Sequence, residues 1–514
     1  MSGHRRLLVV LIAAVALARG WWLRFVQDDA FISFRYARHL AEGLGLVYNP
    51  GERVEGYTNF LWTLAMAPAT ALGIDIVAWS EGLSLASFAA ALALTHALAR
   101  RWHGERAALA ALALTALNAS FDAYATGGLE TMFGIAWVLA AVAALAAGRI
   151  VPAALATAAA VMTRMDASLL LLPFWTAALF PSGVRSFRFR PFAQASALLL
   201  PLVGGWMLAR HAYYGGWVPN TFLIKGDVSP VRGLLYIGLF HLLYGFAAAC
   251  PALWRALRTR RLVTPAVAAV ALWQAYLVLV GGDFMEFRLF LPCFPLLAIC
   301  TGAALFPDGA GPVAPSSRLV SAALLALAVA GLPWLLPPRL IQTVPDLKAY
   351  CAEMADGART LREILGPDAK DVKLAITCAG VLPYLTELPT LDLPGLNDRD
   401  VATDGAPVKP AHAWLGNRPG HCRIATWDQV EAKGVNLLIN YAWTVAGDFA
   451  VGSVAELNAR WPQFHVEIPP GTPVRLVLWP LPGGDRRWAM VYVRPHPAVE
   501  AAIRRSRARV LDLR

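Results

Sequence analysis

The sequence predicts an α-helical protein that crosses a membrane many times and carries a C-terminal α/β domain. The chain of 514 residues is 57% hydrophobic and only 15% charged, whereas soluble proteins have about 25% charged residues. Apolar runs long enough to cross a bilayer as helices recur through the first two thirds of the chain. The last third has a different composition, in which short apolar runs alternate with polar segments.

We expect eleven membrane helices. They lie near residues 7–26, 77–99, 107–122, 129–147, 151–163, 167–181, 192–212, 233–253, 263–281, 288–306 and 318–337. The first run lacks a small-residue cleavage site, so we interpret it as a membrane anchor rather than a signal peptide. The segment 57–73 is also apolar, but counting it as a crossing would place the arginines of residues 100–106 outside. We therefore expect a re-entrant or interfacial helix there.

Arginines set the predicted orientation. Arg5 and Arg6 precede the first helix and place the N-terminus in the cytoplasm. With eleven crossings, the later arginine-rich connections fall on that same side; their residues are Arg100, Arg101, Arg106, Arg149, Arg185, Arg188, Arg190, Arg255, Arg258, Arg260, Arg261 and Arg318. Topology thus explains the net charge of +11, and we expect no nucleic-acid partner. The protein is predicted to lie in a bacterial inner membrane with its C-terminal region in the periplasm.

That C-terminal region predicts a soluble α/β domain of about 175 residues, enough for its own core. The segments "KLAITCAG", "NLLIN", "VRLVLWPL" and "WAMVYVRP" are typical of short buried strands, and "DLKAYCAEMADGARTLREIL" predicts an amphipathic helix. We therefore divide the chain into a membrane domain, 1–337, with a first extracytoplasmic loop at about 27–76, and a soluble domain, 338–514. No CxxC motif occurs, and two of Cys351, Cys378 and Cys422 could pair in an oxidising compartment.

Every connection that is predicted to lie outside carries a polar cluster. The first begins with two adjacent aspartates, Asp28 and Asp29. The polar residues of the five clusters include Arg35, Arg38, Glu42, Glu52, Arg53, Glu55, Asn59, Glu130, Arg164, Asp166, Asn220, Lys225, Asp227, Asp283, Glu286 and Arg288. Charged groups near a bilayer cost free energy and are usually retained for a site. Five clusters on one side therefore predict one shared cavity.

Simpler explanations exist for single clusters. Asp28 and Asp29 could cap a helix that starts near Ala30, because aspartate is a favoured N-cap residue. Arg164 and Asp166 could form a local pair at the end of a short helix. The sequence leaves these alternatives open.

The clusters suit chemistry on a lipid-linked phosphate. A carboxylate can act as general base toward an incoming hydroxyl, and arginine or lysine can hold a departing phosphate. No phosphate loop with GK[ST], no HExxH and no GxSxG occurs in the chain. A membrane-borne activated sugar is then the expected substrate. The alternative is a non-enzymatic lipid-glycan transporter or flippase, or a cell-envelope assembly scaffold. Charges at helix ends on one side favour the enzyme, because a transporter needs them along a path through the bilayer.

The same residues carry a family resemblance. "DDAFISFRYARHLAEGLGLVYNPGERVEGYTNFLW" resembles the first extracytoplasmic loop of GT-C fold glycosyltransferases, above all the terminal arabinofuranosyltransferase (AftB-like) family. "ATGGLET", "MTRMDA", "YYGGWVPNTFLIK", "GGDFMEFR" and "LPTLDLPGLNDRDVA" resemble further motifs of that family, in the same order. "RPGHCR" resembles a family segment in which an acid stands at the position of Cys422.

The resemblance implies inverting transfer of a sugar, with arabinofuranose the best guess, from a polyprenyl-phosphate donor to a glycan or glycolipid hydroxyl. It implies a catalytic aspartate at Asp28 or Asp29 and donor phosphate binding by Arg164, Lys225 and Arg288. The implied sugar and acceptor pocket comprises Arg35, Glu55, Tyr57, Asn59, Glu130, Asp166, Asn220, Asp283 and His421. The C-terminal domain would help to bind the acceptor, with "LDLPGLND" facing the cavity. No cofactor is certain; the acidic residues permit a divalent cation, and GT-C enzymes are known with and without one.

Overall fold

The computed structural model describes most of the chain, namely residues 3–224, 226, 228–259, 262–307, 315–331, 340–410, 412, 414–440, 444–461, 464–481 and 486–514, without the side chains of residues 318, 329, 330 and 368. The predicted domain boundary at 337/338 and the end of the last predicted membrane helix fall outside these residues. The chain forms two compact units. Unit 1 comprises Met1–Val26, Asn59–Gly215 and Ser229–Asp346, and unit 2 comprises Gln27–Thr58, Gly216–Val228 and Leu347–Arg514.

Unit 1 is helical, and each of the eleven predicted segments contains a helix. The helices are α1 (Gly3–Trp22), α3 (Phe60–Ala71), α4 (Ile76–Ala116), α5 (Ala119–Ala123), α6 (Thr131–Ala146), α7 (Ile150–Thr163), α8 (Ala167–Leu179), η1 (Val184–Ser186), α9 (Phe189–Leu199), η2 (Leu200–Gly204), α10 (Gly205–Tyr214), α12 (Pro230–Leu243), η3 (Phe246–Ala249), α13 (Cys250–Arg258), α14 (Thr264–Leu279), η4 (Arg288–Cys293), α15 (Phe294–Leu305) and α16 (Pro315–Ala330).

The lengths of these helices establish a multi-pass membrane protein. Within the described ranges, three helical stretches, Ile76–Ala116, Phe189–Tyr214 and Arg288–Leu305, are long and apolar enough to cross a bilayer. A bent pair of helices adds a fourth if it is counted as one span, and several other apolar helices are shorter. Eleven crossings therefore remain a prediction.

Glycine explains two breaks in the helices. Gly104, in the predicted arginine-rich connection, has φ 76° inside α4 and so divides it into the two predicted helices. The expected continuous helix at 233–253 is wrong. Gly245, with φ 72°, separates α12 from η3 and α13, and the two halves meet at a bend of 79°. A left-handed glycine commonly ends a helix, so the chain turns instead of crossing straight.

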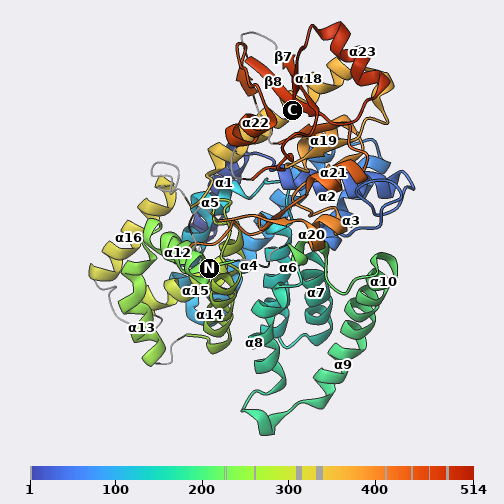
Figure 1. The fold of residues 1–514 in the computed structure, drawn as a ribbon. Helices are drawn as coiled ribbons and strands as arrows, with labels where there is room; N and C mark the ends of the chain where they lie inside the picture. Colours follow the sequence, from blue (N-terminus) through green and yellow to red (C-terminus); the bar gives the residue numbers. More distant parts are fainter. Residues whose placement is uncertain are drawn as a thin grey trace. The chain divides into compact units, whose positions relative to one another are not determined.

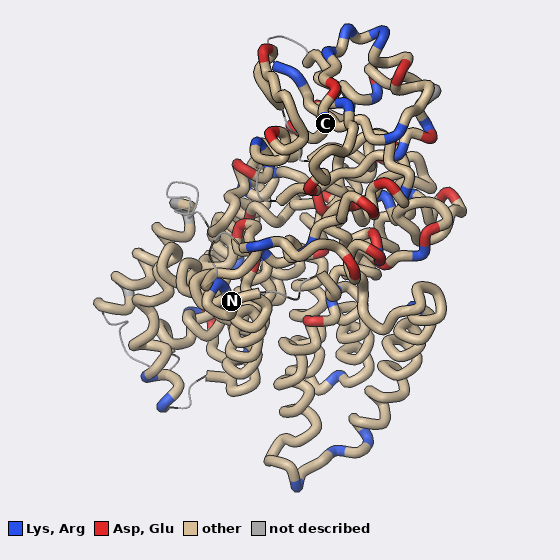
Figure 2. The backbone as a smooth tube through the Cα atoms, viewed as in Figure 1, with Lys and Arg blue, Asp and Glu red and all other residues tan. Residues whose placement is uncertain are grey.

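Helices α6, α7 and α8 pack side by side (Figure 1). Their mutual faces are rich in buried alanine, which lets the backbones approach closely. Lys, Arg, Asp and Glu are nearly absent from the lengths of these helices (Figure 2). The charged residues considered below sit where the helices begin and end.

Unit 2 is built on a seven-stranded mixed sheet with the order β2-β1-β5-β8-β7-β9, in which β6 also pairs with β8. Its strands are β1 (Leu374–Ile376), β2 (Thr390–Asp392), β5 (Leu437–Ile439), β6 (Thr444–Ala446), β7 (Val474–Pro480), β8 (Arg486–Tyr492) and β9 (Arg509–Leu513). The four predicted strands are confirmed as β1, β5, β7 and β8. A second, two-stranded sheet joins β3 (Ala406–Pro407) and β4 (Arg423–Ile424).

Helices cover both faces of the large sheet. Along β7, Leu476 and Leu478 enter one core with α21 (Trp427–Ala432) and α22 (Val454–Arg460), whereas Val477 and Trp479 enter the other with α18 (Val344–Leu365) and α23 (Pro497–Ser506). Burial on both faces explains why this strand is apolar from Leu476 to Trp479. The helices of unit 2 are α2 (Asp28–Ala41), α11 (Asn220–Leu223), α18 (Val344–Leu365, whose first residues belong to unit 1), η5 (Pro367–Ala369), α19 (Val381–Thr386), α20 (Arg399–Asp404), α21 (Trp427–Ala432), α22 (Val454–Arg460) and α23 (Pro497–Ser506).

The polar stretch that follows the first membrane helix packs with the C-terminal residues in unit 2. Helix α2 contacts α19, and Arg38 forms an ion pair with Glu387 at 3.1 Å. The predicted amphipathic helix is confirmed as α18. The six cysteines, all of which are described, are free thiols.

Candidate active site

The two adjacent aspartates occupy the first turn of α2. Gln27, not an aspartate, is the N-cap residue of this helix, so the simple capping explanation is wrong. Instead, the Asp28 carboxylate accepts a hydrogen bond of 2.8 Å from the backbone N–H of Val381, the first residue of α19. Gly380 makes this contact possible, because a Cβ at that position would lie 1.9 Å from the Asp28 carbonyl oxygen.

This environment favours the neutral form of Asp28. Burial raises the pKa of Asp28 to about 7, the hydrogen bond from Val381 opposes the shift, and the nearby charge of Asp29 adds to it. A carboxyl group that titrates near neutrality is suited to accept a proton at physiological pH. Asp29 lies close enough to influence both Asp28 and Asp392 electrostatically.

Arg35 is almost fully buried in unit 2. Its guanidinium donates hydrogen bonds to the carbonyl oxygens of Tyr48, Pro383 and Leu388, at 2.7, 2.6 and 2.9 Å, and to the side chain of Asn49. Two of these bonds tie α2 to the C-terminal third of the chain, at Pro383 and Leu388. The observed contacts therefore describe a positioning role.

Asn220 connects three segments of unit 2. Its side-chain NH₂ donates to the carbonyl oxygens of Gly395, Leu396 and Asp398, at 2.5, 3.2 and 3.0 Å. Its backbone N–H donates to the carbonyl oxygen of Glu55 at 2.9 Å. Glu55 is itself buried. Asn220 thus holds the first loop against the turn that the motif "LDLPGLND" forms.

Tyr57 and His421 complete the predicted residues of unit 2. Tyr57 packs its ring edge-on against Tyr36, with centroids 4.9 Å apart. The ring of His421 lies 5.0 Å from that of Phe464 at an interplanar angle of 48°, and its Nδ1 lies 3.3 Å from the carbonyl oxygen of Pro419. Lys225 lies outside the described residues.

A second cluster lies within unit 1. Arg164 caps the C-terminus of α7 and forms the expected local pair with Asp166, at 3.0 and 2.5 Å. It also reaches Glu130, 34 positions away, with an Nη1–Oε1 distance of 2.9 Å. Asn59 donates to the other Glu130 oxygen at 2.8 Å, and the Tyr276 hydroxyl donates to Asp166 at 3.1 Å. Arg164 therefore joins the starts and ends of several helices.

Arg288 and Asp283 belong to the same cluster. The Arg288 Nε donates to Asp283 at 3.1 Å. Arg288 lines a small cavity together with Glu130, Arg164 and Asp166. The cavity holds about 20 Å³, roughly the space of one water molecule. Two of the three predicted phosphate-binding cations thus converge on one point, in the company of carboxylates.

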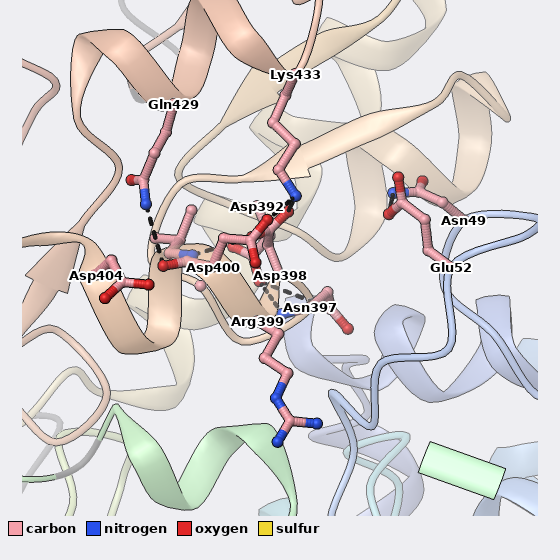
Figure 3. Close-up of polar contacts among 12 residues, drawn as sticks. Asn49, Glu52, Asp392, Asn397, Asp398, Arg399, Asp400, Asp404, Gln429 and Lys433 are labelled. Carbon is pink, nitrogen blue, oxygen red and sulfur yellow. Dashed lines mark hydrogen bonds and ion pairs between the residues drawn. The ribbon is translucent and has the colours of Figure 1, made fainter. Parts of the chain in front are cut away.

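One buried acid of unit 2 is not among the site residues expected from the sequence. Asp392 is 1% exposed, and its Oδ2 accepts from the backbone and side-chain nitrogens of Asn397 at 2.8 and 3.0 Å. Burial raises its pKa to about 7. Figure 3 draws Asp392 with its partner Asn397; in the same view, Lys433 reaches Asp398 at 3.0 Å and Asp400 at 2.6 Å. The acid-rich segment "LDLPGLNDRD" was the signal in the sequence that pointed here.

Within the described ranges, no group of three or more His, Cys, Asp or Glu side chains is arranged to hold an ion.

Comparison with solved structures identifies the fold. ArnT from Cupriavidus metallidurans bound to undecaprenyl phosphate matches with a TM-score of 0.57 at 15% identity, over 96% of this chain and all of that one. The oligosaccharyltransferase AglB from Archaeoglobus fulgidus, in complex with an inhibitory peptide and a dolichol-phosphate, matches with a TM-score of 0.52 at 11% identity, over 96% of this chain and 75% of that one. The chain has the GT-C fold.

Sequence comparison narrows this GT-C likeness. The chain is 28% identical over 360 residues to the terminal β-(1→2)-arabinofuranosyltransferase of Corynebacterium glutamicum, and 27% identical over 354 residues to that of Mycobacterium tuberculosis. Each alignment covers 58% of this chain and 51% or 56% of the relative, so the chain spans about half the length of these relatives. A domain of unknown function, DUF8728, matches residues 346–490. The resemblance drawn from the first-loop motif is confirmed.

Proposed function

We propose that this GT-C protein is a membrane glycosyltransferase that moves a sugar from a polyprenyl-phosphate donor to a glycan hydroxyl. The observation that carries the proposal is the convergence of Arg164 and Arg288 on one cavity at the ends of membrane helices. Arginines at such a place suit a lipid-linked phosphate, because the lipid stays in the bilayer while its head group reaches the surface. The sugar is arabinofuranose in this proposal, following the two named relatives.

The proposed reaction is a single displacement. Asp28 or Asp29 accepts the proton of the acceptor hydroxyl while that oxygen attacks the anomeric carbon. The bond from the anomeric carbon to the phosphate oxygen breaks, and the polyprenyl phosphate leaves with both electrons. Attack opposite the leaving group inverts the anomeric centre. Asp28 is the better candidate, because its pKa of about 7 leaves it basic enough to take a proton and ionised enough to act.

Arg164, Arg288 and Lys225 are proposed to hold the departing phosphate. Glu130, Asp166 and Asp283 are paired with the two described arginines. These carboxylates would keep the guanidiniums oriented until the donor arrives. Asn59 and Tyr57 would line the sugar pocket, and Glu55 would be placed there by Asn220. Arg35 would act by positioning α2 rather than by contact with substrate.

The proposed orientation follows the arginine distribution. The N-terminus lies in the cytoplasm, and unit 2 lies on the periplasmic face of a bacterial inner membrane. The enzyme then binds its acceptor, a glycan or glycolipid, on the outer side of the membrane. No nucleotide-sugar is expected there, so the donor has to be lipid-linked.

Purified protein in liposomes tests the proposal with synthetic polyprenyl-phosphate sugars. Pentofuranose and hexose donors are offered in parallel, and the product is analysed for its anomeric configuration by NMR. We expect transfer with inversion and a preference for arabinofuranose. Movement of the donor lipid across the bilayer without transfer from any donor would instead identify a flippase.

A further inference from the structure

Unit 2 contains a cleft that none of the site residues above lines. It has a volume of about 600 Å³ and is formed by the segments 406–409, 424–428 and 465–469. Pockets that bind small ligands typically measure about 300–1,000 Å³. The cleft is therefore large enough for several sugar rings or a short peptide.

The residues that line the cleft are next to residues that pack in the core or cap a helix. In the segment 464–469, Val466 and Ile468 enter the core, whereas His465 and Glu467 alternate with them and line the cleft. On the other side, Thr426 caps α21 in a reciprocal capping box with Gln429. Asp428 follows in the first turn of that helix and is exposed. The polar groups of the cleft thus stand on elements whose backbones are held in place.

The chemistry of the walls mixes donors and acceptors at close intervals. Lys409 can only donate hydrogen bonds, Asp428 and Glu467 can only accept them when ionised, and Thr426 and His465 can do both. Prolines 407 and 469 add flat apolar surface between them. A sugar ring presents hydroxyls that donate and accept at its edge and C–H groups on its faces, so it can satisfy such walls.

Other ligand classes fit less well. Two carboxylates against one ammonium group disfavour a phosphorylated or acidic ligand. A lipid chain requires a continuous apolar wall, and the charged groups interrupt it. A basic peptide is the remaining competitor, and it differs from a neutral glycan in its dependence on charge.

We propose that this cleft is a binding subsite for a neutral oligosaccharide, the acceptor glycan of the proposed transfer. This inference rests on the proposed function. The cleft would hold sugar units of the acceptor that take no part in bond making. It should therefore affect the KM of long acceptors and leave kcat unchanged.

A binding measurement tests the cleft without any transfer. The full-length protein in detergent is titrated with an arabinofuranosyl tetrasaccharide, the corresponding disaccharide and an oligolysine peptide, each followed by saturation-transfer NMR. The double variant Asp428→Asn/Glu467→Gln should bind the tetrasaccharide about tenfold more weakly, because it loses two charge-assisted hydrogen bonds. The double variant Glu353→Gln/Asp448→Asn makes the same charge change at exposed positions outside the cleft and should bind like the wild type.

A kinetic measurement separates the cleft from the reaction centre. With the tetrasaccharide as acceptor, the cleft variant should show a KM about tenfold higher at unchanged kcat, and with the disaccharide it should match the wild type. Equal losses with both acceptors, equal losses in the control variant, or binding of oligolysine alone would overturn the inference. If no donor supports transfer but the cleft variant still loses tetrasaccharide binding, the proposed function fails and the subsite stands.

Discussion

Single residues decide the proton chemistry proposed here. Asp28 and Asp29 are neighbours in sequence, and the Asp28 carboxylate accepts a hydrogen bond from the N-terminus of α19. Burial raises the pKa of Asp28 from its ordinary value of 3.8 to about 7. A base at Asp28 should therefore show a pH midpoint near neutrality.

If Asp28 is the base, transfer should increase with pH through a midpoint near 7, because only the ionised carboxylate accepts the proton. Asp28→Asn should lower the rate of transfer at least about a hundredfold. Asp29→Asn serves as the matched control, since it removes a neighbouring charge and should move the midpoint to lower pH while keeping activity. The pH profile of kcat/KM checks this, and a profile that is flat from pH 5 to 8 (roughly the span around the expected midpoint) would assign the base elsewhere.

The same pKa has a consequence for stability. The folded protein binds the Asp28 proton more tightly than the unfolded chain, so the ionised carboxylate lowers the free energy of unfolding as pH rises from about 4 to about 7. Asp28→Asn keeps an oxygen for the Val381 N–H without the charge. Above pH 7 this variant should therefore be more stable, by on the order of 1 kcal/mol after allowance for partial exposure. Thermal unfolding at two pH values measures the difference, which should vanish below pH 4, a level near the ordinary pKa.

Arg164 tests whether the site needs the planar guanidinium group of arginine or only a positive charge. Its three nitrogens reach Asp166 twice and Glu130 once, a geometry that lysine cannot reproduce. Arg164→Lys should therefore lower kcat/KM for a polyprenyl-phosphate sugar by about a hundredfold, or close to 3 kcal/mol. Arg185→Gln, on an exposed residue of the same unit, is the control and should retain full activity. Wild-type kinetics in Arg164→Lys would show that charge alone suffices.

At the scale of elements, the side-chain amide of Asn220 links two short segments of unit 2. Its NH₂ group donates to three carbonyl oxygens of one turn and so fixes α11 to the turn before α20. Asn220→Ala leaves these acceptors without their donor, and we expect a loss of about 1–3 kcal/mol in the free energy of unfolding. We also expect lower activity, because the Asn220 backbone N–H that binds the Glu55 carbonyl oxygen loses its own anchor to the turn. Thermal unfolding and transfer are measured on the same preparation.

Asn458 supplies the matched control for this variant. It too binds backbone with its amide, donating to the carbonyl of Ile468 at 2.8 Å and accepting from its N–H at 3.2 Å. Asn458→Ala should lose comparable stability but, once folded, keep its activity toward the disaccharide acceptor, because Ile468 borders the proposed cleft and not the reaction centre. Equal activity losses in both variants would mean that stability, and not the position of Glu55, governs turnover.

Periodicity predicted most of the elements, because it depends on local sequence. The strands β1, β5, β7 and β8 and the amphipathic helix α18 were visible as apolar runs and a helical stripe. The break at Gly245 was not, since glycine is tolerated inside many helices and only its left-handed backbone marks a stop. The sequence assigns the first loop to the membrane domain, whereas its packing against α19 depends on contacts between residues about 350 positions apart.

The predicted site residues also divide into those that a local sequence pattern reveals and those that depend on contacts distant in sequence. Charge and motif singled out Arg164, Asp166 and Glu130, and the structure joins them. Asp392 was missed because its burial comes from the sheet and from Asn397, neither of which a local pattern reveals. The resemblance implies a place for Arg35 in the sugar and acceptor pocket, and the structure adds partners that no local pattern reveals, namely backbone carbonyls distant in sequence.

For the whole molecule, the arginine distribution makes a prediction that the helices alone do not decide. If eleven helices cross, Arg185 lies in the cytoplasm and Asp448 in the periplasm. Cysteine is introduced as Arg185→Cys or Asp448→Cys at these exposed positions, and a membrane-impermeant maleimide is added to intact cells. Asp448→Cys should be labelled at once and Arg185→Cys only after the membrane is permeabilised. The parent chain, with its own six thiols, gives the background. Labelling of both positions in intact cells would mean that an even number of helices crosses the membrane between them, contrary to the prediction. Labelling of Arg185→Cys alone would mean that the protein has the opposite orientation, and the proposed reaction would then have no periplasmic acceptor.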